Sequence, residues 1–399
     1  MPINNSYNQA QGYSNVEAPY SNAAYSSSQW LEKEQARNRR SKWIVIGSIV
    51  ALLGLVAIGV GVGVTVAKNH KSSGSSSKTS GSSSSGDPSS FTLDARLKKS
   101  FYGIAYTPYG SQYPECGNSL DDVITDIQLL SQLTDQIRLY GADCNQTALV
   151  LEAIERTKVN MTVWLGNYPI PTDPAPYERQ RDAIIDALKT YGADHVAGIT
   201  VGNEFMLNYL NANGGSEANS AVGDAGAQLL IANITDTRNA VAALNLGKTL
   251  PIGTADAGSF FNTEVLQAVD FGMSNIHAWF ANVSIDQAAG WVNDFFQTNN
   301  VEVAAGLSNH PDFFIAETGW PTASKDVGNE SNGPSVASEA NLQIFINDFV
   351  CNANKNGTKY FFFEYFDETW KDAQFGGVEG HWGLFYSNRT LKNIEIPTC

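Results

Sequence analysis

The sequence predicts a TIM barrel, the (β/α)8 fold of the α/β class, over residues 97–399. From Phe101 onward eight short apolar runs recur, at 101–106, 136–141, 161–166, 196–202, 249–255, 273–280, 313–320 and 360–366. Segments with apolar residues at helical spacing, such as SLDDVITDIQLLSQL, separate them. Eight strands that alternate with helices favour a closed parallel barrel, and about 300 residues suit that fold. A doubly wound open sheet is the alternative, but no phosphate-binding glycine turn follows the first run.

Three segments precede the predicted barrel. Residues 1–42 are polar and rich in Asn, Ser, Tyr and Gln, so we predict a disordered tail. Residues 43–67 contain no charged side chain, and a helix of that length, rising about 1.5 Å per residue, crosses a bilayer. A cleaved signal peptide is the alternative, but its apolar stretch is shorter and begins nearer the N-terminus. Residues 68–96 read as a flexible Ser/Gly-rich linker.

Charges, sequons and cysteines indicate how the predicted span is oriented. Four basic residues directly precede the span, at Arg37, Arg39, Arg40 and Lys42. This charge distribution favours a cytoplasmic N-terminus. Seven N-glycosylation triplets follow the span, at Asn145, Asn160, Asn233, Asn282, Asn329, Asn356 and Asn388, against one before it, at Asn4. The cysteines also follow it, at 116, 144, 351 and 399, and an even count in an oxidising compartment indicates two disulfides. We therefore predict a single-pass type II plasma-membrane protein with an extracellular barrel.

Composition narrows the classes of ligand. The net charge is −15 and no basic stripe appears after the span, so a nucleic-acid partner is not predicted. The sequence contains no HExxH, no Gly-x-Ser-x-Gly and no Cys/His cluster, so metal and serine-triad chemistry are poorly supported. An acidic, aromatic-rich domain is compatible with a neutral polymer, and we expect a monomer without a metal or cofactor.

Function in such a barrel gathers where the strands end. Two predicted strands end on acids, Glu204 in ITVGNE and Glu317 in FIAETGW. A carboxylate after an apolar run is costly to bury unless it is paired, protonated or used in chemistry. Two carboxyl groups that face each other can protonate a glycosidic oxygen and attack the anomeric carbon. We therefore predict that Glu204 and Glu317 form a catalytic pair.

Other strand-end residues are candidates for substrate contact. Asn203 can hydrogen-bond a sugar hydroxyl, and the rings of Tyr106 and Trp320 offer faces on which a pyranose can stack. The predicted substrate-binding set is Tyr106, Asn203, His277, Trp279, Trp320 and Glu364, with Arg138 and Asp143 as electrostatic support.

Structural roles are equally expected for several of these residues. Arg138 is as suited to neutralising barrel carboxylates as to touching substrate. A salt-bridged role is as expected as a functional one for Glu364 and for Asp256. A hydrogen-bonded core position is the commoner role for a histidine such as His277.

The motifs around these residues carry a family resemblance. The stretches YGIAYTPYG, IRLYGADCNQT, ITVGNEF, GTADAGS, IAETGWPT, FFFEYFDETW and HWGLF resemble the fungal branch of glycoside hydrolase family 17, the β-1,3-glucan endoglucosidases. The resemblance spans about Phe101 to Cys399 and implies a (β/α)8 barrel that retains anomeric configuration. It also implies Glu204 as acid/base and Glu317 as nucleophile. Relatives commonly have His-Pro-Tyr where this chain has His277-Ala278-Trp279, which leaves the subsite preference open.

The function that follows is endo-hydrolysis of β-1,3-glucan in the fungal cell wall, which the barrel would face. Glucanosyl transfer shares the covalent intermediate and is the nearest alternative. A non-catalytic glucan-binding wall anchor and action on β-1,6 or mixed-linked glucan are further alternatives. We also predict the disulfides Cys116–Cys144, joining the loops after the first two strands, and Cys351–Cys399, tying the terminus to the helix before the eighth.

Overall fold

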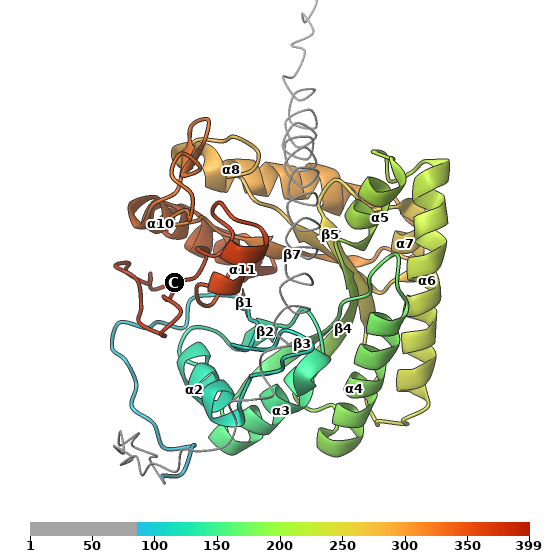
Figure 1. The fold of residues 1–399 in the computed structure, drawn as a ribbon, viewed down its shortest axis with the longest axis horizontal. Helices are drawn as coiled ribbons and strands as arrows, with labels where there is room; N and C mark the ends of the chain where they lie inside the picture. The colour runs from blue at the N-terminus through green and yellow to red at the C-terminus, as the bar shows by residue number, and fades with distance from the viewer. Residues whose placement is uncertain (1–85) are drawn as a thin grey trace, which may run out of the picture. The chain divides into compact units, whose positions relative to one another are not determined.

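Eight parallel strands close into a barrel, in the order β1-β10-β7-β6-β5-β4-β3-β2 (Figure 1). They are β1 (Gly103–Ala105), β2 (Gln136–Arg138), β3 (Thr162–Asn167), β4 (Val196–Asn203), β5 (Ile252–Ala257), β6 (Phe271–Asn275), β7 (Asp312–Thr318) and β10 (Tyr360–Phe362). The computed structural model describes residues 86–399. The predicted tail and membrane span, and most of the linker, lie outside the described residues. Within 86–399, no helix has the length and apolar character needed to cross a membrane.

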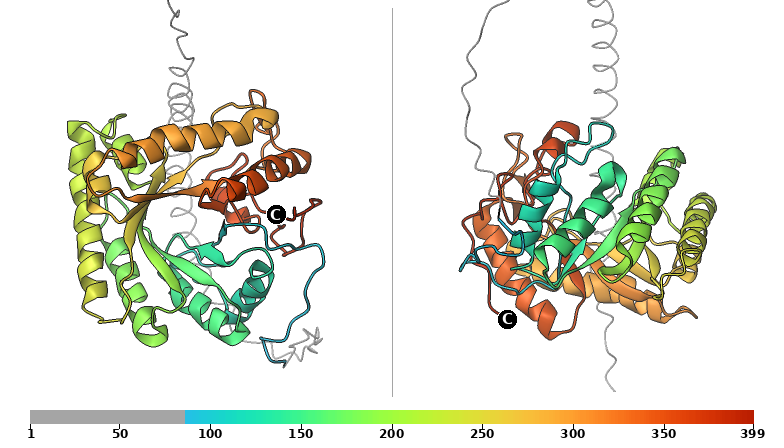
Figure 2. Two further views of the ribbon diagram at one scale, coloured as in Figure 1. Left: turned by 180° about the vertical axis from the view of Figure 1, so that it is seen from behind. Right: turned by 90° about the horizontal axis from the view of Figure 1, so that it is seen from below.

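Helices surround the barrel on the outside (Figure 2). They are α2 (Leu120–Leu130), α3 (Gln146–Thr157), α4 (Ala175–Tyr191), α5 (Phe205–Asn213), α6 (Ala221–Ala242), α7 (Thr263–Ala268), α8 (Ile285–Phe296), α9 (Glu302–Ala305), α10 (Glu339–Lys355) and α11 (Thr369–Gln374). Short elements add η2 (Asp143–Asn145), η3 (Gln297–Val301) and the hairpin β8 (Ser331–Asn332) and β9 (Ser335–Val336). The alternation of strand and helix confirms the predicted TIM barrel.

Serine caps begin three of the helices. Ser119, Ser220 and Ser338 each have extended backbone angles and accept a hydrogen bond from a backbone N–H in the first turn of α2, α6 and α10. Such caps satisfy N–H groups that otherwise lack a partner within the helix. They therefore fix where the chain leaves each loop and enters the helical layer.

The barrel interior is filled by aromatic rings below the strand ends. Trp164 contacts Phe271 and Phe314 edge-on, with ring centroids 4.8 and 4.9 Å apart, and Phe361 lies beside them. All four residues are buried. Apolar filling of the lower barrel leaves the polar strand-end residues to line its mouth, which is the usual division in this fold.

The predicted strand boundaries were wrong at the sixth and eighth runs. The sixth strand is Phe271–Asn275 rather than 273–280, because the chain turns after Asn275 and the Phe280 N–H donates to the His277 carbonyl (3.1 Å). The eighth ends at Phe362, and the Glu364 N–H donates instead to the Trp382 carbonyl (3.2 Å). Apolar side chains continue past both strand ends because they pack around the barrel mouth. Hydrophobicity alone therefore overestimated how far these two strands extend.

Both predicted disulfides are confirmed. Cys116 bonds Cys144 with Cα atoms 5.0 Å apart, and Cys351 bonds Cys399 with Cα atoms 5.5 Å apart. The first joins the β1–α2 and β2–α3 loops at the carboxyl ends of the strands. The second ties the C-terminus to α10.

Candidate active site

Two strand ends at the barrel mouth place the acidic pair. Glu317 lies within β7 and is 6% exposed, while Glu204 directly follows β4 and is partly buried. Glu204 has φ 55°, a left-handed conformation that costs a non-glycine residue about 1 kcal/mol. Its N–H donates to the Ala255 carbonyl of β5 (3.0 Å), and its own carbonyl accepts the first hydrogen bond of α5, from Asn208. The strained turn is therefore held by the next strand and the following helix.

Arg138 connects Glu317 to the residue before Glu204. Its guanidinium donates to Glu317 Oε1 (3.1 Å) and to Asn203 Oδ1 (2.7 Å), and it lies 4.3 Å from the centroid of the Tyr140 ring. The side chain is only 1% exposed, so this is a buried ion pair supported by a hydrogen bond. These contacts agree with the predicted role of Arg138 as electrostatic support.

Glu317 is held ionised. Burial alone would raise its pKa, but the hydrogen bond from His277 and the charge of Arg138 outweigh burial and lower that pKa to about 2. His277 Nε2 lies 3.2 Å from Glu317 Oε2, so each carboxylate oxygen has its own partner. The His277 ring is fixed by edge contacts with Phe363 and Trp382, at centroid distances of 5.3 and 4.8 Å. A carboxylate ionised at every ordinary pH is what a nucleophile requires.

Glu204 has the opposite tendency. Burial and then the negative charge of Glu317 raise the pKa of Glu204, against a lowering by the hydrogen bond from Asn275. Asn275 Nδ2 donates to Glu204 Oε1 (3.0 Å) and is 3.4 Å from Asn203 Oδ1. The surroundings thus move the pKa values of the two carboxyl groups in opposite directions, a pattern typical of a catalytic acid beside a carboxylate.

A second charged cluster lies beside the pair, on α11 and the segment before it. Lys371 Nζ is 2.9 Å from Glu364 and 2.5 Å from Glu368, and all three side chains are at most 12% exposed. Burial and then the neighbouring Glu368 raise the pKa of Glu364. Burial also raises the pKa of Glu379, which follows α11, to about 7. Both oxygens of Glu364 accept from Lys371, so the structure gives Glu364 the salt-bridged role rather than the predicted substrate contact.

The two predicted sugar platforms are wrong. Trp320 is fully buried, its indole N–H donates to the Val336 carbonyl (2.8 Å), and its ring packs against Phe345. Tyr106 is 1% exposed and donates to Asp126 of α2 (2.8 Å). Neither ring offers a face to a ligand, because both point from the strand ends into the layer between barrel and helices.

Trp279 and Asp143 also differ from their predicted roles. Trp279 is 6% exposed and packs edge-on against Phe280, so no open ring face remains for a sugar. Asp143 accepts two hydrogen bonds from Arg179 (2.6 and 2.8 Å) and supports that arginine rather than the glutamates. Asp256 accepts from the Met206 N–H (2.8 Å) and so fixes the start of α5, which is a structural role.

Sequence reasoning missed Asn275, Tyr168 and Tyr140. Asn275 pairs with Glu317 in the sheet register, and it stood inside the sixth predicted strand, which was too long for its end to mark this residue. Tyr168 follows β3, and desolvation and the charges of Glu204 and Glu317 raise its pKa. Burial, and then Glu317, raise the pKa of Tyr140. Both tyrosines therefore line the carboxylate pair.

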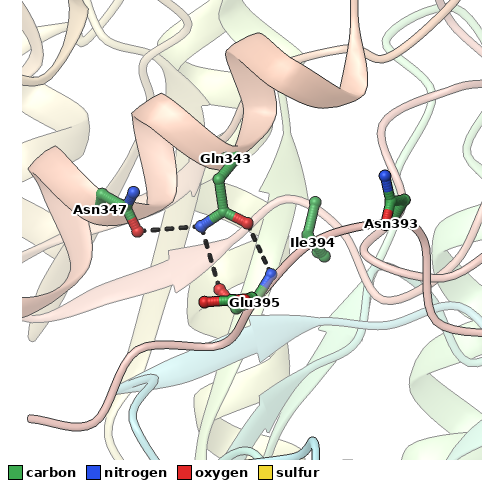
Figure 3. A pocket seen from close by; sticks show the side chains of 5 residues that line it. All are labelled: Gln343, Asn347, Asn393, Ile394 and Glu395. Atoms are coloured by element: carbon green, nitrogen blue, oxygen red, sulfur yellow. Dashed lines mark hydrogen bonds between the residues drawn. The ribbon is translucent and has the colours of Figure 1, made fainter.

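A surface hollow elsewhere on the barrel has none of this chemistry. It lies between α10 and the C-terminal segment, and Gln343, Asn347, Asn393, Ile394 and Glu395 line it (Figure 3). Gln343 donates to Asn347 (2.9 Å) and to the Glu395 carbonyl (3.1 Å), and it accepts from the Glu395 N–H. These polar groups satisfy one another, so the carboxylate pair is the candidate site. Within residues 86–399 no cluster of three His, Cys, Asp or Glu side chains could hold a metal.

A TIM barrel whose mouth holds one glutamate with a lowered pKa and one with a raised pKa has the features of a glycosidase with a paired acid and carboxylate. Comparison with known proteins agrees. Residues 103–383 match the family described as the BtgE/BtgC glycoside hydrolase domain, and the chain belongs to that family.

Two kinds of relative are similar to this chain. The probable glucan endo-1,3-beta-glucosidase btgC of Aspergillus terreus is 39% identical over 318 residues, which cover 76% of this chain and 46% of that protein. The chain therefore spans about half the length of the curated relatives it matches. A Rhizomucor miehei glycoside hydrolase family 17 beta-1,3-glucanosyltransferase is 26% identical, with a TM-score of 0.59 over 75% of this chain and 99% of that one. An active-site mutant of a Rhizomucor miehei beta-1,3-glucanosyltransferase in complex with laminaritriose has a TM-score of 0.60, with the same identity and coverage.

Proposed function

We propose that this chain is a retaining endo-β-1,3-glucanase of the fungal cell wall. The single observation that carries the proposal is the opposed environment of the two glutamates. Arg138 and His277 both bind Glu317, whereas Glu204 accepts its hydrogen bond from the neutral amide of Asn275. The family and the β-1,3-glucosidase names of its relatives support β-1,3-glucan as the substrate.

In the first step, one Glu317 oxygen attacks the anomeric carbon. The carbon–oxygen bond to the leaving sugar breaks, and Glu204 gives its proton to that oxygen. In the second step, Glu204 as carboxylate takes a proton from water, whose oxygen attacks the same carbon and releases the Glu317 ester. Two inversions retain the configuration. Arg138 and His277 hold Glu317 in place before attack, and the Asn275 amide orients the Glu204 carboxyl.

The test uses two variants and two substrates. Glu317→Ala is expected to abolish turnover of every substrate, because the glycosyl ester cannot form. Glu204→Ala is expected to lose most activity on natural glucan, by at least about 100-fold, yet to retain activity on an aryl glycoside whose leaving group needs no proton. Added azide should rescue that variant by replacing water in the second step.

Two outcomes would contradict the assignment. One is a Glu317→Ala variant with near-normal activity. The other is a crystal structure in which the two carboxyl groups are about 6.5–9.5 Å apart, the inverting range, rather than about 5–5.5 Å. The matched control is Glu264→Ala on α7, a glutamate that bonds Gln228 outside the site.

Glucanosyl transfer is the second candidate, favoured by the solved Rhizomucor miehei glucanosyltransferases. Hydrolysis and transfer share the covalent intermediate, and the outcome depends on whether water or a sugar hydroxyl attacks it. Products from a defined laminari-oligosaccharide separate the two, since transfer yields chains longer than the substrate and hydrolysis yields shorter ones only.

We further propose that the barrel is extracellular and anchored by the apolar segment 43–67. The sequence supports this through seven sequons after the segment and one before it. Glycosidase treatment of the full chain should shift its mobility on a gel, and protease added outside intact cells should release an active barrel. A chain that is neither glycosylated nor cut from outside would refute this location.

A further inference from the structure

An exposed tyrosine whose ring packs against an arginine lies in the loop between β1 and α2. Tyr113 is 56% exposed, and the Arg179 guanidinium lies 3.9 Å from its ring centroid. A guanidinium over one face of an aromatic ring is an attractive contact. One face of the Tyr113 ring is therefore occupied by a cation, and the exposed remainder is open to solvent.

The arginine behind this ring is itself fixed. Arg179 donates through Nε and a terminal nitrogen to the two oxygens of Asp143, at 2.6 and 2.8 Å. A two-point arginine–carboxylate pair fixes the plane of the guanidinium. The disulfide Cys116–Cys144 joins the segment next to Tyr113 to the residue after Asp143. The ring, its arginine and its carboxylate thus come from the connections that follow β1, β3 and β2, all at the end of the barrel that carries the glutamates.

The first turns of α4 connect this assembly to the carboxylate pair. Gln180, the neighbour of Arg179, is buried, and its Oε1 accepts from the N–H groups of Ala142 (3.0 Å) and Tyr168 (3.1 Å). Its Nε2 donates to the Tyr168 carbonyl (3.1 Å). Tyr168 in turn lies near enough to Glu204 and Glu317 for their charges to raise its pKa. Consecutive residues of one helix therefore hold an aromatic ring at the glutamates and another at the rim.

We propose that Tyr113 is a remote sugar platform, which stacks on a glucosyl unit of a long glucan several units from the cleaved bond. This inference rests on the proposed function. A β-linked glucopyranose carries its hydroxyls around the ring edge and leaves apolar faces, which match an exposed aromatic face. Backing by Arg179 keeps the ring ordered before the ligand arrives, so little side-chain entropy is lost on binding. Tyr113 acts in binding and not in the chemical step.

The experiment compares a long and a short substrate. Tyr113→Ala is expected to raise KM for soluble laminarin about fivefold to tenfold at unchanged kcat, the size of one lost ring contact. Turnover of laminaritriose is expected to stay the same, because on this proposal a short chain bound at the glutamates leaves Tyr113 unoccupied. Tyr113→Phe should restore laminarin affinity, because the ring is kept.

The matched control is Tyr191→Ala. Tyr191 is the last residue of the same helix α4, at the opposite end of the barrel, and its removal should change neither substrate. Two results would overturn the platform while leaving the proposed function intact. One is a rise in KM of Tyr113→Ala that is equal for laminarin and laminaritriose, and the other is an unchanged KM for laminarin. A wild-type chain that cleaves neither substrate would refute the proposed function instead.

A binding arm then tests the platform without turnover. Glu317→Ala is expected to co-sediment with particulate β-1,3-glucan, and Glu317→Ala combined with Tyr113→Ala to bind several-fold more weakly. Equal binding by the two chains, or no binding by either, would overturn the platform.

Discussion

Arg138→Met tests what makes the pKa of Glu317 lower than that of Glu204. The substitution keeps a long apolar stem but removes the cation 3.1 Å from Glu317 Oε1. At that distance an effective dielectric constant of about 20 gives an attraction of about 5 kcal/mol, part of which was already offset by the cost of burying both groups. A neighbouring arginine typically lowers a carboxyl pKa by about 1–3 units. We therefore expect the pKa of Glu317 to rise from about 2 to between about 3 and 5.

The assay is the pH dependence of kcat/KM with an aryl glycoside, whose leaving group needs no proton from Glu204. The acid limb then reports Glu317 in the free enzyme, because only its ionised form attacks. In the wild type, activity should persist down to about pH 3, whereas in Arg138→Met it should fall below about pH 4–5. His277 still bonds Glu317 in the variant, so the limb should not move beyond the range of an ordinary glutamate.

The free energy of unfolding should also fall when the pKa of Glu317 is raised. Since the folded-state pKa of Glu317 is lowered, its contribution to stability is present above the unfolded pKa of about 4.3 and is lost as pH falls through about 2. Each unit by which Arg138→Met raises that pKa removes about 1.4 kcal/mol near neutral pH. The control is Arg238→Met, because Arg238 pairs with Asp270 on the surface (2.7 Å). An acid limb that stays in place in Arg138→Met would show that Arg138 does not keep Glu317 ionised.

Three further outcomes are expected. Asn275→Ala removes the hydrogen bond that lowers the pKa of Glu204. The basic limb of the pH–activity profile on natural glucan should therefore move upward by about half a pH unit to one unit. A basic limb that does not move would contradict the role of Asn275. Trp320→Phe should lower the free energy of unfolding by about 1 kcal/mol through the lost bond to Val336, measured by urea denaturation, with KM for glucan unchanged; a raised KM would restore the predicted platform. Replacing Cys351 and Cys399 together by Ser opens a loop of sequence separation 48, so stability should fall by about 4 kcal/mol, while the activity of the folded fraction at about 25 °C is kept.

The sequence predicted the barrel and the acidic pair because both leave a strong local pattern. The eight apolar runs mark the strands, and the segments between them have apolar residues at helical spacing. An acid at the end of such a run is unusual enough to mark Glu204 and Glu317. The direction of a side chain at a strand end leaves no such pattern. Tyr106 and Trp320 both follow strands at the predicted mouth, yet their rings turn outward to Asp126 and Phe345, partners that belong to the surrounding helices α2 and α10.

Asn275 shows a different limit of the sequence. Its role comes from the parallel register that sets it beside Glu317, and register is not readable from one strand alone. The contacts of Asp143 also depend on tertiary structure. From its position it suited support of the glutamates, but Arg179 of α4 reaches it with two hydrogen bonds.

The second buried cluster pairs the charge of Lys371 with carboxylates other than Glu204. A free cation near Glu204 would lower its pKa and remove the acid that the leaving sugar needs. Burial alone would lower the pKa of Lys371, but Glu364 and Glu368 raise it, so the lysine stays charged and its charge is matched by these two partners. Arg138 is directed in the same way, toward Glu317 and the amide oxygen of Asn203. Lys371 and Arg138 both donate to carboxylates other than Glu204. The charge of Arg138 still lowers the pKa of Glu204, so burial and the charge of Glu317 account for its raised pKa.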